Sequence, residues 1–287
     1  MGYINVKDNN IIIASCNEAR NNSINELFIN AINDRNYFPI FTYYNCFNST
    51  NHYTSSLNNM NLEKRNKIDN RILAGDGLYA YDEFKKTSKL CSAGFWARRQ
   101  PNRNYIATAG HCYYLGLSPF YLLPWNSTST TAEIGEMPIH YLEPIDFGLI
   151  NIDIKKIQPI PCVRNTDSER YKELFIEDVI LASNNGAHLC LSGIRSHVKC
   201  GYVAALNGFT SNGVYFRDNI FVVNLRYIPG DSGGAIFYYK NLTQVSLNGI
   251  VQGGLFDFND NINGITGVIT LRSILNEIED LEVVTTS

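Results

Sequence analysis

From about residue 71 onward, the sequence is a succession of short apolar runs separated by turn-forming residues. The runs lie at 90–97, 104–109, 146–152, 179–183, 198–206, 214–224, 234–239, 245–251 and 264–270. Many short strands at such close spacing are typical of a β-sandwich or β-barrel, because parallel α/β folds need a helix between successive strands. This feature therefore predicts an all-β fold for most of the chain.

The end of this region has a different periodicity. In LRSILNEIEDL (271–281), residues Leu271, Ile274, Leu275, Ile278 and Leu281 fall on one stripe at helical spacing. We therefore expect an amphipathic helix to close the domain.

The first 70 residues do not follow the β pattern throughout. Two extended runs flank Asp8-Asn9-Asn10, which predicts a hairpin, and residues 25–34 carry apolar side chains at roughly helical spacing. Residues 47–70 are polar, rich in Asn and Ser, and nearly without periodicity, as in a linker. We therefore divide the chain into a small α+β segment with its linker, 1–66, and a β domain, 67–287.

Charge and hydropathy exclude two classes of partner. The 287 residues have a formal net charge of −3 and no run of Lys and Arg, so the electrostatic footprint of a nucleic-acid-binding protein is missing. No stretch approaches the roughly 18 consecutive apolar residues of a membrane span. We therefore expect neither nucleic acid nor a membrane as partner.

Cysteines and possible glycosylation sites suggest an oxidising compartment. None of the seven cysteines has the CxxC spacing of a zinc site, so we expect no metal. Four N-x-[ST] acceptors, at Asn21, Asn48, Asn126 and Asn241, are compatible with a secreted glycoprotein. The residues after Met1 lack the basic and apolar regions of a signal peptide, so either the protein is not exported or this chain lacks its true beginning.

Three motifs within the β region carry catalytic residue types. In chain order, TAGHC (108–112) supplies His111, IDFGLI (145–150) supplies Asp146 and PGDSGG (229–234) supplies Ser232. A serine hydroxyl is a poor nucleophile until a neighbouring base takes its proton, and imidazole can accept and return that proton near neutral pH. A carboxylate on the other ring nitrogen fixes the tautomer and stabilises the imidazolium. The order His, Asp, Ser is that of chymotrypsin-like serine proteases.

The glycines around Ser232 suit an oxyanion hole. Attack on a carbonyl places negative charge on its oxygen, which backbone N–H groups can stabilise. Gly230 has no side chain to block that approach, so we assign the hole to the N–H groups of Gly230 and Ser232. Asp231 would point away from substrate and lock the loop through an ion pair or a hydrogen bond.

Each motif alone also has a structural explanation. Four other histidines, at positions 52, 140, 188 and 197, are alternatives to His111, and Asp153 is an alternative to the nearby Asp146. The ordered combination on an all-β background favours catalysis. An α/β-hydrolase esterase is disfavoured, because that fold uses G-x-S-x-G and the order Ser, Asp, His.

At these residues the chain resembles the chymotrypsin-like serine peptidases, and most of all the secreted microbial α-lytic protease and streptogrisin group. The likeness extends to RILAGDGLY (71–79), KLCSAGFWA before ATAGHC, LCLSGIRSHVKCG (189–201) and GITGVITLRSILNEI. The resemblance implies two antiparallel six-stranded β-barrels with a C-terminal helix, an active site between them and no cofactor. It also implies the disulfides Cys91–Cys112 and Cys190–Cys200.

The N-terminal run GYINVKDNNIIIAS resembles a hairpin in the C-terminal part of that group's pro-region. The resemblance implies that residues 1–66 are a pro-region fragment that assists folding and then inhibits the enzyme by occupying its cleft. Cleavage would follow Lys64-Arg65 or fall near Arg71-Ile72. The alternative is a decorating subdomain with no inhibitory role.

The chain departs from the group's pattern at several positions. A disulfide that usually flanks the serine loop is missing, with Arg226 and Phe258 near the two positions, and Gln252 replaces a serine that commonly bonds the catalytic Asp. Cys16 and Cys46 can pair within the pro-region, which leaves Cys162 as a buried thiol.

The side chains that would bind substrate are less well defined. We expect the pocket for the P1 residue (the residue on the N-terminal side of the cut bond) to be lined by residues around 222–229 and by Gln252, Gly253 and Gly254, with Asn224 near its base. No Asp stands there to bind Lys or Arg, which favours an apolar or aromatic P1. The sequence thus predicts a secreted, monomeric serine endopeptidase that is made as a zymogen and cleaves proteins or peptides. The alternative is a catalytically silent homologue that acts as a binding protein.

Overall fold

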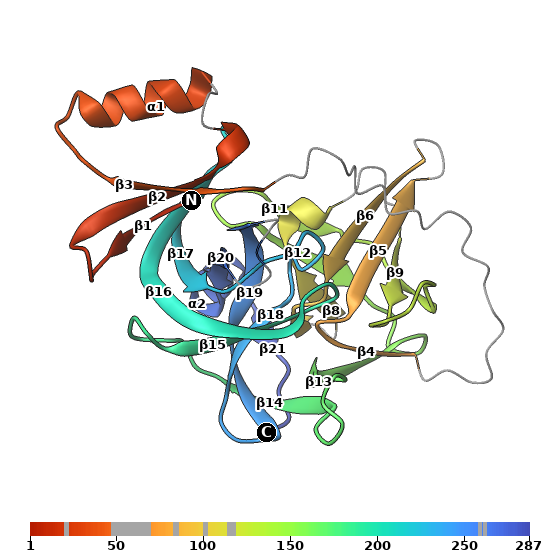
Figure 1. Cartoon of the computed structure of the whole chain (residues 1–287). Helices are drawn as coiled ribbons and strands as arrows, with labels where there is room; N and C mark the ends of the chain where they lie inside the picture. Colours follow the sequence, from red (N-terminus) through yellow and green to blue (C-terminus); the bar gives the residue numbers. More distant parts are fainter. Residues whose placement is uncertain are drawn as a thin grey trace.

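The computed structural model describes residues 1–19, 23–46, 70–82, 86–99, 103–113, 119–257, 260 and 263–287, with no side-chain description for Ile24. Almost all regular structure in these residues is β, arranged in three sheets (Figure 1). The all-β fold predicted from the short apolar runs is therefore confirmed. The closed two-barrel arrangement stays a prediction, and the predicted linker and its boundary at residue 66 lie almost wholly outside the described residues.

Two smaller sheets contain the strands on either side of the first motif. The four-stranded sheet has the order β10-β9-β5-β6, and the five-stranded sheet has the order β11-β12-β8-β7-β21. The bounds of the first are β5 Gly77–Asp82, β6 Thr87–Ser92, β9 Phe120–Leu123 and β10 Ala132–Gly135. Those of the second are β7 Phe95–Arg99, β8 Arg103–Thr108, β11 Ile139–Tyr141, β12 Phe147–Asn151 and β21 Leu281–Val283.

A twelve-stranded sheet contains the rest of the β domain and the N-terminal strands. Its main path is β3-β2-β1-β16-β15-β18-β19-β14-β13-β4, and β17 and β20 pair beside it. The N-terminal strands are β1 Gly2–Asn5, β2 Asn10–Cys16 and β3 Ile40–Tyr44. The others are β4 Arg71–Ala74, β13 Gln158–Arg164, β14 Glu173–Val179, β15 His188–Gly193, β16 His197–Ser211, β17 Phe216–Asn224, β18 Ala235–Tyr239, β19 Gln244–Phe256 and β20 Gly264–Thr270.

Three predicted elements differ from the structure. The run 90–97 is split between β6 and β7, because the chain passes between two sheets at Gly94, where a Cβ would lie 2.7 Å from Ile250 and 2.8 Å from the Gly233 carbonyl oxygen. The run 179–183 is wrong as a strand, since β14 ends at Val179. The closing helix α2, Leu271–Glu277, ends earlier than predicted, and Leu281 belongs to β21, which pairs with β7.

The remaining predicted strands and the N-terminal hairpin are present with bounds shifted by a few residues. The predicted helix at 25–34 is α1, Ser23–Asn33, and short 3₁₀ turns lie at Asn17–Ala19 and Gly110–Cys112. The two smaller sheets share one apolar cluster, which includes Leu78 and Ile106, and the largest cluster joins the five-stranded sheet to the large sheet around Phe95, Phe147 and Phe237. The three motifs therefore lie at the ends of strands that these clusters hold in place.

The N-terminal segment extends the large sheet of the β domain. Strand β1 pairs antiparallel with β16, with Gly2 opposite Phe209 and Tyr3 opposite Gly208. Buried Ala14 packs with Val222 and Ile265 of the β domain, and the side-chain amide of Asn45 donates to Asp257 at 3.1 Å. In Figure 1 this segment lies at the outer side of the β16–β17 hairpin, with α1 farthest from the β domain.

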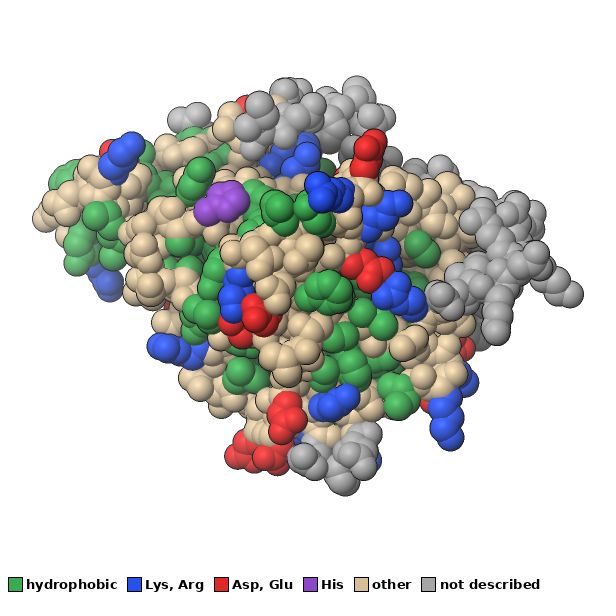
Figure 2. Space-filling model, turned by 90° about the horizontal axis from the view of Figure 1, so that it is seen from below, with side chains coloured by type: hydrophobic (Ala, Val, Ile, Leu, Met, Phe, Trp, Pro, Cys, Tyr) green, Lys and Arg blue, Asp and Glu red, His purple; other side chains and the backbone are tan. Residues whose placement is uncertain are grey.

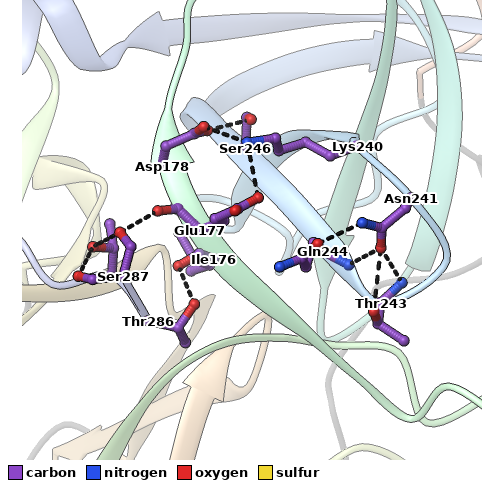
Figure 3. Close-up of polar contacts among 11 residues, drawn as sticks. Ile176, Glu177, Asp178, Lys240, Asn241, Thr243, Gln244, Ser246, Thr286 and Ser287 are labelled. Carbon is purple, nitrogen blue, oxygen red and sulfur yellow. Dashed lines mark hydrogen bonds and ion pairs between the residues drawn. The ribbon is translucent and has the colours of Figure 1, made fainter.

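The C-terminus is tied to β14 on the opposite side of the domain. The Thr286 N–H donates to the Ile176 carbonyl at 2.8 Å, and Lys240 forms ion pairs with Glu177 at 2.8 Å and Asp178 at 2.6 Å (Figure 3). Asn241 lies in the adjoining turn and its side-chain oxygen accepts from the Thr243 and Gln244 N–H groups.

The surface agrees with the mixed charge of the sequence. On the face in Figure 2, Lys and Arg side chains are interspersed with Asp and Glu. Of the four N-x-[ST] acceptors, Asn126 and Asn241 are exposed, whereas Asn21 and Asn48 lie outside the described residues. None of the helices in the described ranges has the length and apolar character that a bilayer span requires.

Candidate active site

His111 and Asp146 form a two-point contact. The Asp146 carboxylate accepts from the backbone N–H of His111 at 2.7 Å and lies 2.8 Å from its Nδ1. His111 lies in the 3₁₀ turn that follows β8, and Asp146 directly precedes β12, which pairs with β8. Because Asp146 is 2 % exposed, its charge acts in a dry environment and holds the ring with Nε2 directed away from the carboxylate.

A buried arginine also lies beside the Asp146 carboxylate. Arg217, at the start of β17, places Nη2 3.7 Å from the Asp146 Oδ2 and donates through Nε to the Leu142 carbonyl at 2.8 Å. The Gln252 amide donates instead to Thr210 at 2.8 Å, and its buried oxygen has no partner among the described residues. The hydrogen bond between Gln252 and Asp146 that the sequence suggested is therefore not formed.

The serine loop is fixed by the carboxylate of Asp231, which is completely buried. It accepts hydrogen bonds from the backbone N–H groups of Arg195 and Ser196, both at 2.9 Å, from the N–H of Ile228 at 3.0 Å and from the Ser196 hydroxyl. Burial raises the pKa of Asp231, and these donors oppose that shift. The lock consists of hydrogen bonds, and no ion pair to Asp231 occurs among the described residues.

The backbone of this loop has the features of an oxyanion hole. Gly230 has φ +115°, which other residues rarely adopt. Within the described part of the chain, neither the Gly230 nor the Ser232 N–H donates to another protein group. Both donors are thus available to an incoming oxygen.

Ser232 is anchored close to the histidine motif. Its carbonyl accepts from the Ser92 N–H at 2.8 Å, and Gly233 lies so close to the histidine strand that a Cβ there would be 2.0 Å from the Thr108 hydroxyl. The Ser232 hydroxyl, however, forms its side-chain hydrogen bond with Tyr227, at 3.0 Å. No hydrogen bond joins Ser232 to His111 in this structure, although both are among the described residues.

A cleft of about 490 Å³ opens beside the histidine. Its lining includes His111, Asp146 and Tyr227, together with Gln252, Gly253 and Gly254 as predicted. Asn224 does not line it. The prediction that Asn224 forms the pocket base is therefore wrong, because its side chain is exposed at the end of β17, where Asn224 pairs with Tyr202.

Three disulfides are present: Cys91–Cys112, Cys190–Cys200 and Cys16–Cys46. The first fixes the residue next to His111 to strand β6. Cys162 is a free buried thiol, and burial raises its pKa to about 11. Each group of described residues with metal-ligand spacing contains one of these disulfide pairs, so its sulfurs are not available as thiolate ligands.

Of the alternatives to His111 and Asp146 that the structure describes, only His140 lies at the site. Asp153 accepts from the Lys155 N–H in a turn, His197 bonds Asp167, and His188 packs against Tyr202. His140 is the exception, because it stacks on Tyr113 at 3.7 Å and lines the cleft. His52 and Phe258 lie outside the described residues.

Solved structures with a similar fold include Thermobifida fusca Protease A, with a TM-score of 0.59 and 21% identity over 75% of this chain and 99% of that chain. Nocardiopsis protease matches with a TM-score of 0.58, at 21% identity over 75% of this chain and 100% of that chain. The chain has the fold of chymotrypsin-like microbial serine proteases. Cellulomonas bogoriensis chymotrypsin agrees, with a TM-score of 0.56 at 19% identity over 75% and 100% of the two chains. No family model and no curated protein match the sequence.

Two residues of this site were missed in the sequence, Tyr227 and Arg217. Tyr227 had a weak signal, because it lies five residues before Ser232 within the stretch expected to wall the pocket. Arg217 had none, since its contact with Asp146 joins β17 to the residue before β12, which is far away in the sequence. Arg226, at the expected site of the missing disulfide, lies with its guanidinium 5.1 Å from the Phe256 ring centre.

Proposed function

We propose that the protein is a serine endopeptidase that works through an acyl-enzyme. The observation that carries this proposal is the two-point contact of Asp146 with His111 at a cleft that Tyr227 also lines, together with the hydrogen bond between Tyr227 and the Ser232 hydroxyl. The all-β fold shared with serine proteases supports it.

In the proposed reaction, the Ser232 hydroxyl oxygen attacks the carbonyl carbon of the peptide bond while His111 Nε2 takes its proton. The N–H groups of Gly230 and Ser232 stabilise the oxyanion. His111 then returns the proton to the departing amine, which leaves an ester on Ser232. Water then attacks the ester carbon while His111 takes its proton, and His111 gives that proton to the Ser232 oxygen as the bond to the acyl carbon breaks and the acid is released. Asp146 holds the imidazole throughout. Ser232 first exchanges its bond to Tyr227 for one to His111.

We further propose that residues 1–66 are an inhibitory pro-segment of a secreted, monomeric zymogen. Met1 lines the same cleft as His111, and the segment shares the large sheet and a small core with the β domain. The three disulfides suit an oxidising compartment. The substrates are proteins or peptides. Among the described residues, the only acidic side chain in the cleft lining is Asp146, which is paired with His111, and this supports an uncharged P1 preference.

A catalytically silent binding protein is the second candidate. It is favoured by the Tyr227–Ser232 hydrogen bond and by the lack of one between Ser232 and His111. A fluorophosphonate probe with a small leaving group separates the two. We expect stoichiometric labelling, located at Ser232 by peptide mass spectrometry, and no labelling of Ser232→Ala. Intact, folded protein that stays unlabelled from about pH 6 to 9, where a histidine base is usually neutral, would establish the silent alternative.

A further inference from the structure

Asp146 is the last residue of a short turn between two strands of the five-stranded sheet. Strands β11 and β12 pair antiparallel, with Tyr141 opposite Phe147, so residues 142–146 form the turn that joins them. Among the described residues, both hydrogen bonds to the Asp146 carboxylate come from His111. The carboxylate that holds the histidine therefore needs support from outside the histidine turn.

Arg217 contacts both ends of this turn. Its Nε donates to the carbonyl of Leu142, the first residue of the turn, at 2.8 Å, and its Nη2 lies 3.7 Å from the Asp146 Oδ2 at the other end. The second distance exceeds that of an N–H···O hydrogen bond, so Arg217 acts on the carboxylate through its charge. It therefore leaves Oδ2 to the Nδ1 of His111, which lies 2.8 Å away.

Arg217 belongs to the large sheet and not to the sheet that carries Asp146. It is the second residue of β17 and is 7 % exposed, and its guanidinium lies 5.2 Å from the Tyr215 ring centre. Strand β17 pairs with β16 at this point, with Arg217 opposite Thr210. Ser232 lies in the loop before β18 of the same sheet. Arg217 thus links the turn that carries Asp146 to the sheet whose loop carries the nucleophile.

Other ionisable groups also surround the pair of Asp146 and His111. Lys89 of β6 and Tyr227 interact electrostatically with Asp146, which also borders a second cavity of about 620 Å³. Further groups lie in the turn itself, in the serine loop or in the lining of the two cavities: Glu143, His140, Asp218, Asp231, Arg272 and Glu277. Apart from His111, Arg217 is the one cationic side chain in the described ranges that forms an ion pair with Asp146. Its removal should therefore change the field at the pair most.

We infer that Arg217 is a positioning residue for catalysis: it holds together the two ends of the turn that presents Asp146 to His111, and its fixed charge sets the pH range in which His111 acts as a base. This inference rests on the proposed peptidase activity and deepens it. A positive charge beside the pair repels the imidazolium and offsets part of its attraction to Asp146. Activity should therefore extend to lower pH with Arg217 than without it.

The test measures the rate constant for fluorophosphonate labelling of Ser232 in the full chain from about pH 5 to 9, a range that includes histidine titration. In Arg217→Met we expect the plateau rate to fall at least about 10-fold, because Asp146 orients His111 less well. We expect the midpoint of the acid limb to move up by about 0.5 pH unit or more, because the repelling charge is gone. A role in folding alone would reduce the fraction of protein that reacts and would leave the midpoint unchanged.

Two further variants separate the charge from the link between the ends of the turn. Arg217→Lys keeps the charge, but its single ammonium group cannot contact both Leu142 and Asp146, so it should keep the wild-type midpoint and only part of the rate. Arg272→Met removes an exposed arginine that lines the second cavity, and it should change neither quantity.

An unchanged rate and midpoint in folded Arg217→Met would overturn the inference, and so would an equal shift of the midpoint in Arg272→Met. Wild-type protein that stays unlabelled at every pH would instead show that the proposed function itself fails, and the inference falls with it.

Discussion

Replacing Arg217 with methionine tests which residue supports Asp146. Methionine keeps most of the buried volume but removes the charge 3.7 Å from the Asp146 carboxylate and the hydrogen bond to Leu142. At an effective dielectric constant of about 20, two unit charges at this separation attract by about 4.5 kcal/mol. Desolvation offsets part of that, so we expect Arg217→Met to lower the free energy of unfolding by about 3 kcal/mol.

A double-mutant cycle isolates the pair from the lost Leu142 contact. Urea unfolding of wild type, Arg217→Met, Asp146→Asn and the double variant should give a coupling energy of about 1–3 kcal/mol. The same cycle with Gln252→Met should give a coupling near zero, because the Gln252 amide bonds Thr210. The reverse result, with coupling to Gln252 and none to Arg217, would refute the assignment of Arg217 as the neighbour that positions Asp146.

Two more experiments test buried packing. Cys162 should resist Ellman's reagent in the folded protein at pH 8, because a pKa of about 11 leaves about one thiol in a thousand ionised. It should react once urea unfolds the chain, and fast reaction in the native state would contradict its burial. Gly233→Ala should lower the free energy of unfolding by at least about 2 kcal/mol and abolish fluorophosphonate labelling of Ser232. The reason is that Gly233 has φ +82° and its added Cβ would meet backbone atoms of Ser92 and Ala109 at 2.7 Å. Gly213→Ala is the control for the backbone effect alone, because Gly213 has φ +85° and open space around it.

The sequence predicted well those features that depend on short local patterns. The hairpin around Asp8-Asn9-Asn10 and the strands 245–251 and 264–270 follow from turn residues and alternation, and the structure contains them. The split at Gly94 was missed because the apolar run is continuous, and only contacts with Ile250 and Gly233, far along the chain, require a bend there.

The site likewise has some residues that local patterns reveal and others that depend on contacts far along the chain. His111, Asp146 and Ser232 stand in recognisable local motifs, so their types and order could be predicted. Arg217 contacts Asp146 and Tyr227 packs against Gly254, and no local pattern encodes these contacts between distant parts of the chain. The position of Asn224 was misjudged because a shift of one residue along a strand reverses the face to which a side chain points.

The four donors to Asp231 have a consequence for how such an enzyme would be kept inactive. All of them come from Arg195, Ser196 and Ile228, on the same side of any cut between residues 46 and 70. The turn around the nucleophile therefore needs no newly created amino terminus to complete it. A precursor and its trimmed product would differ in the access of substrate to Ser232. The loop that holds Ser232 would have the same structure in both.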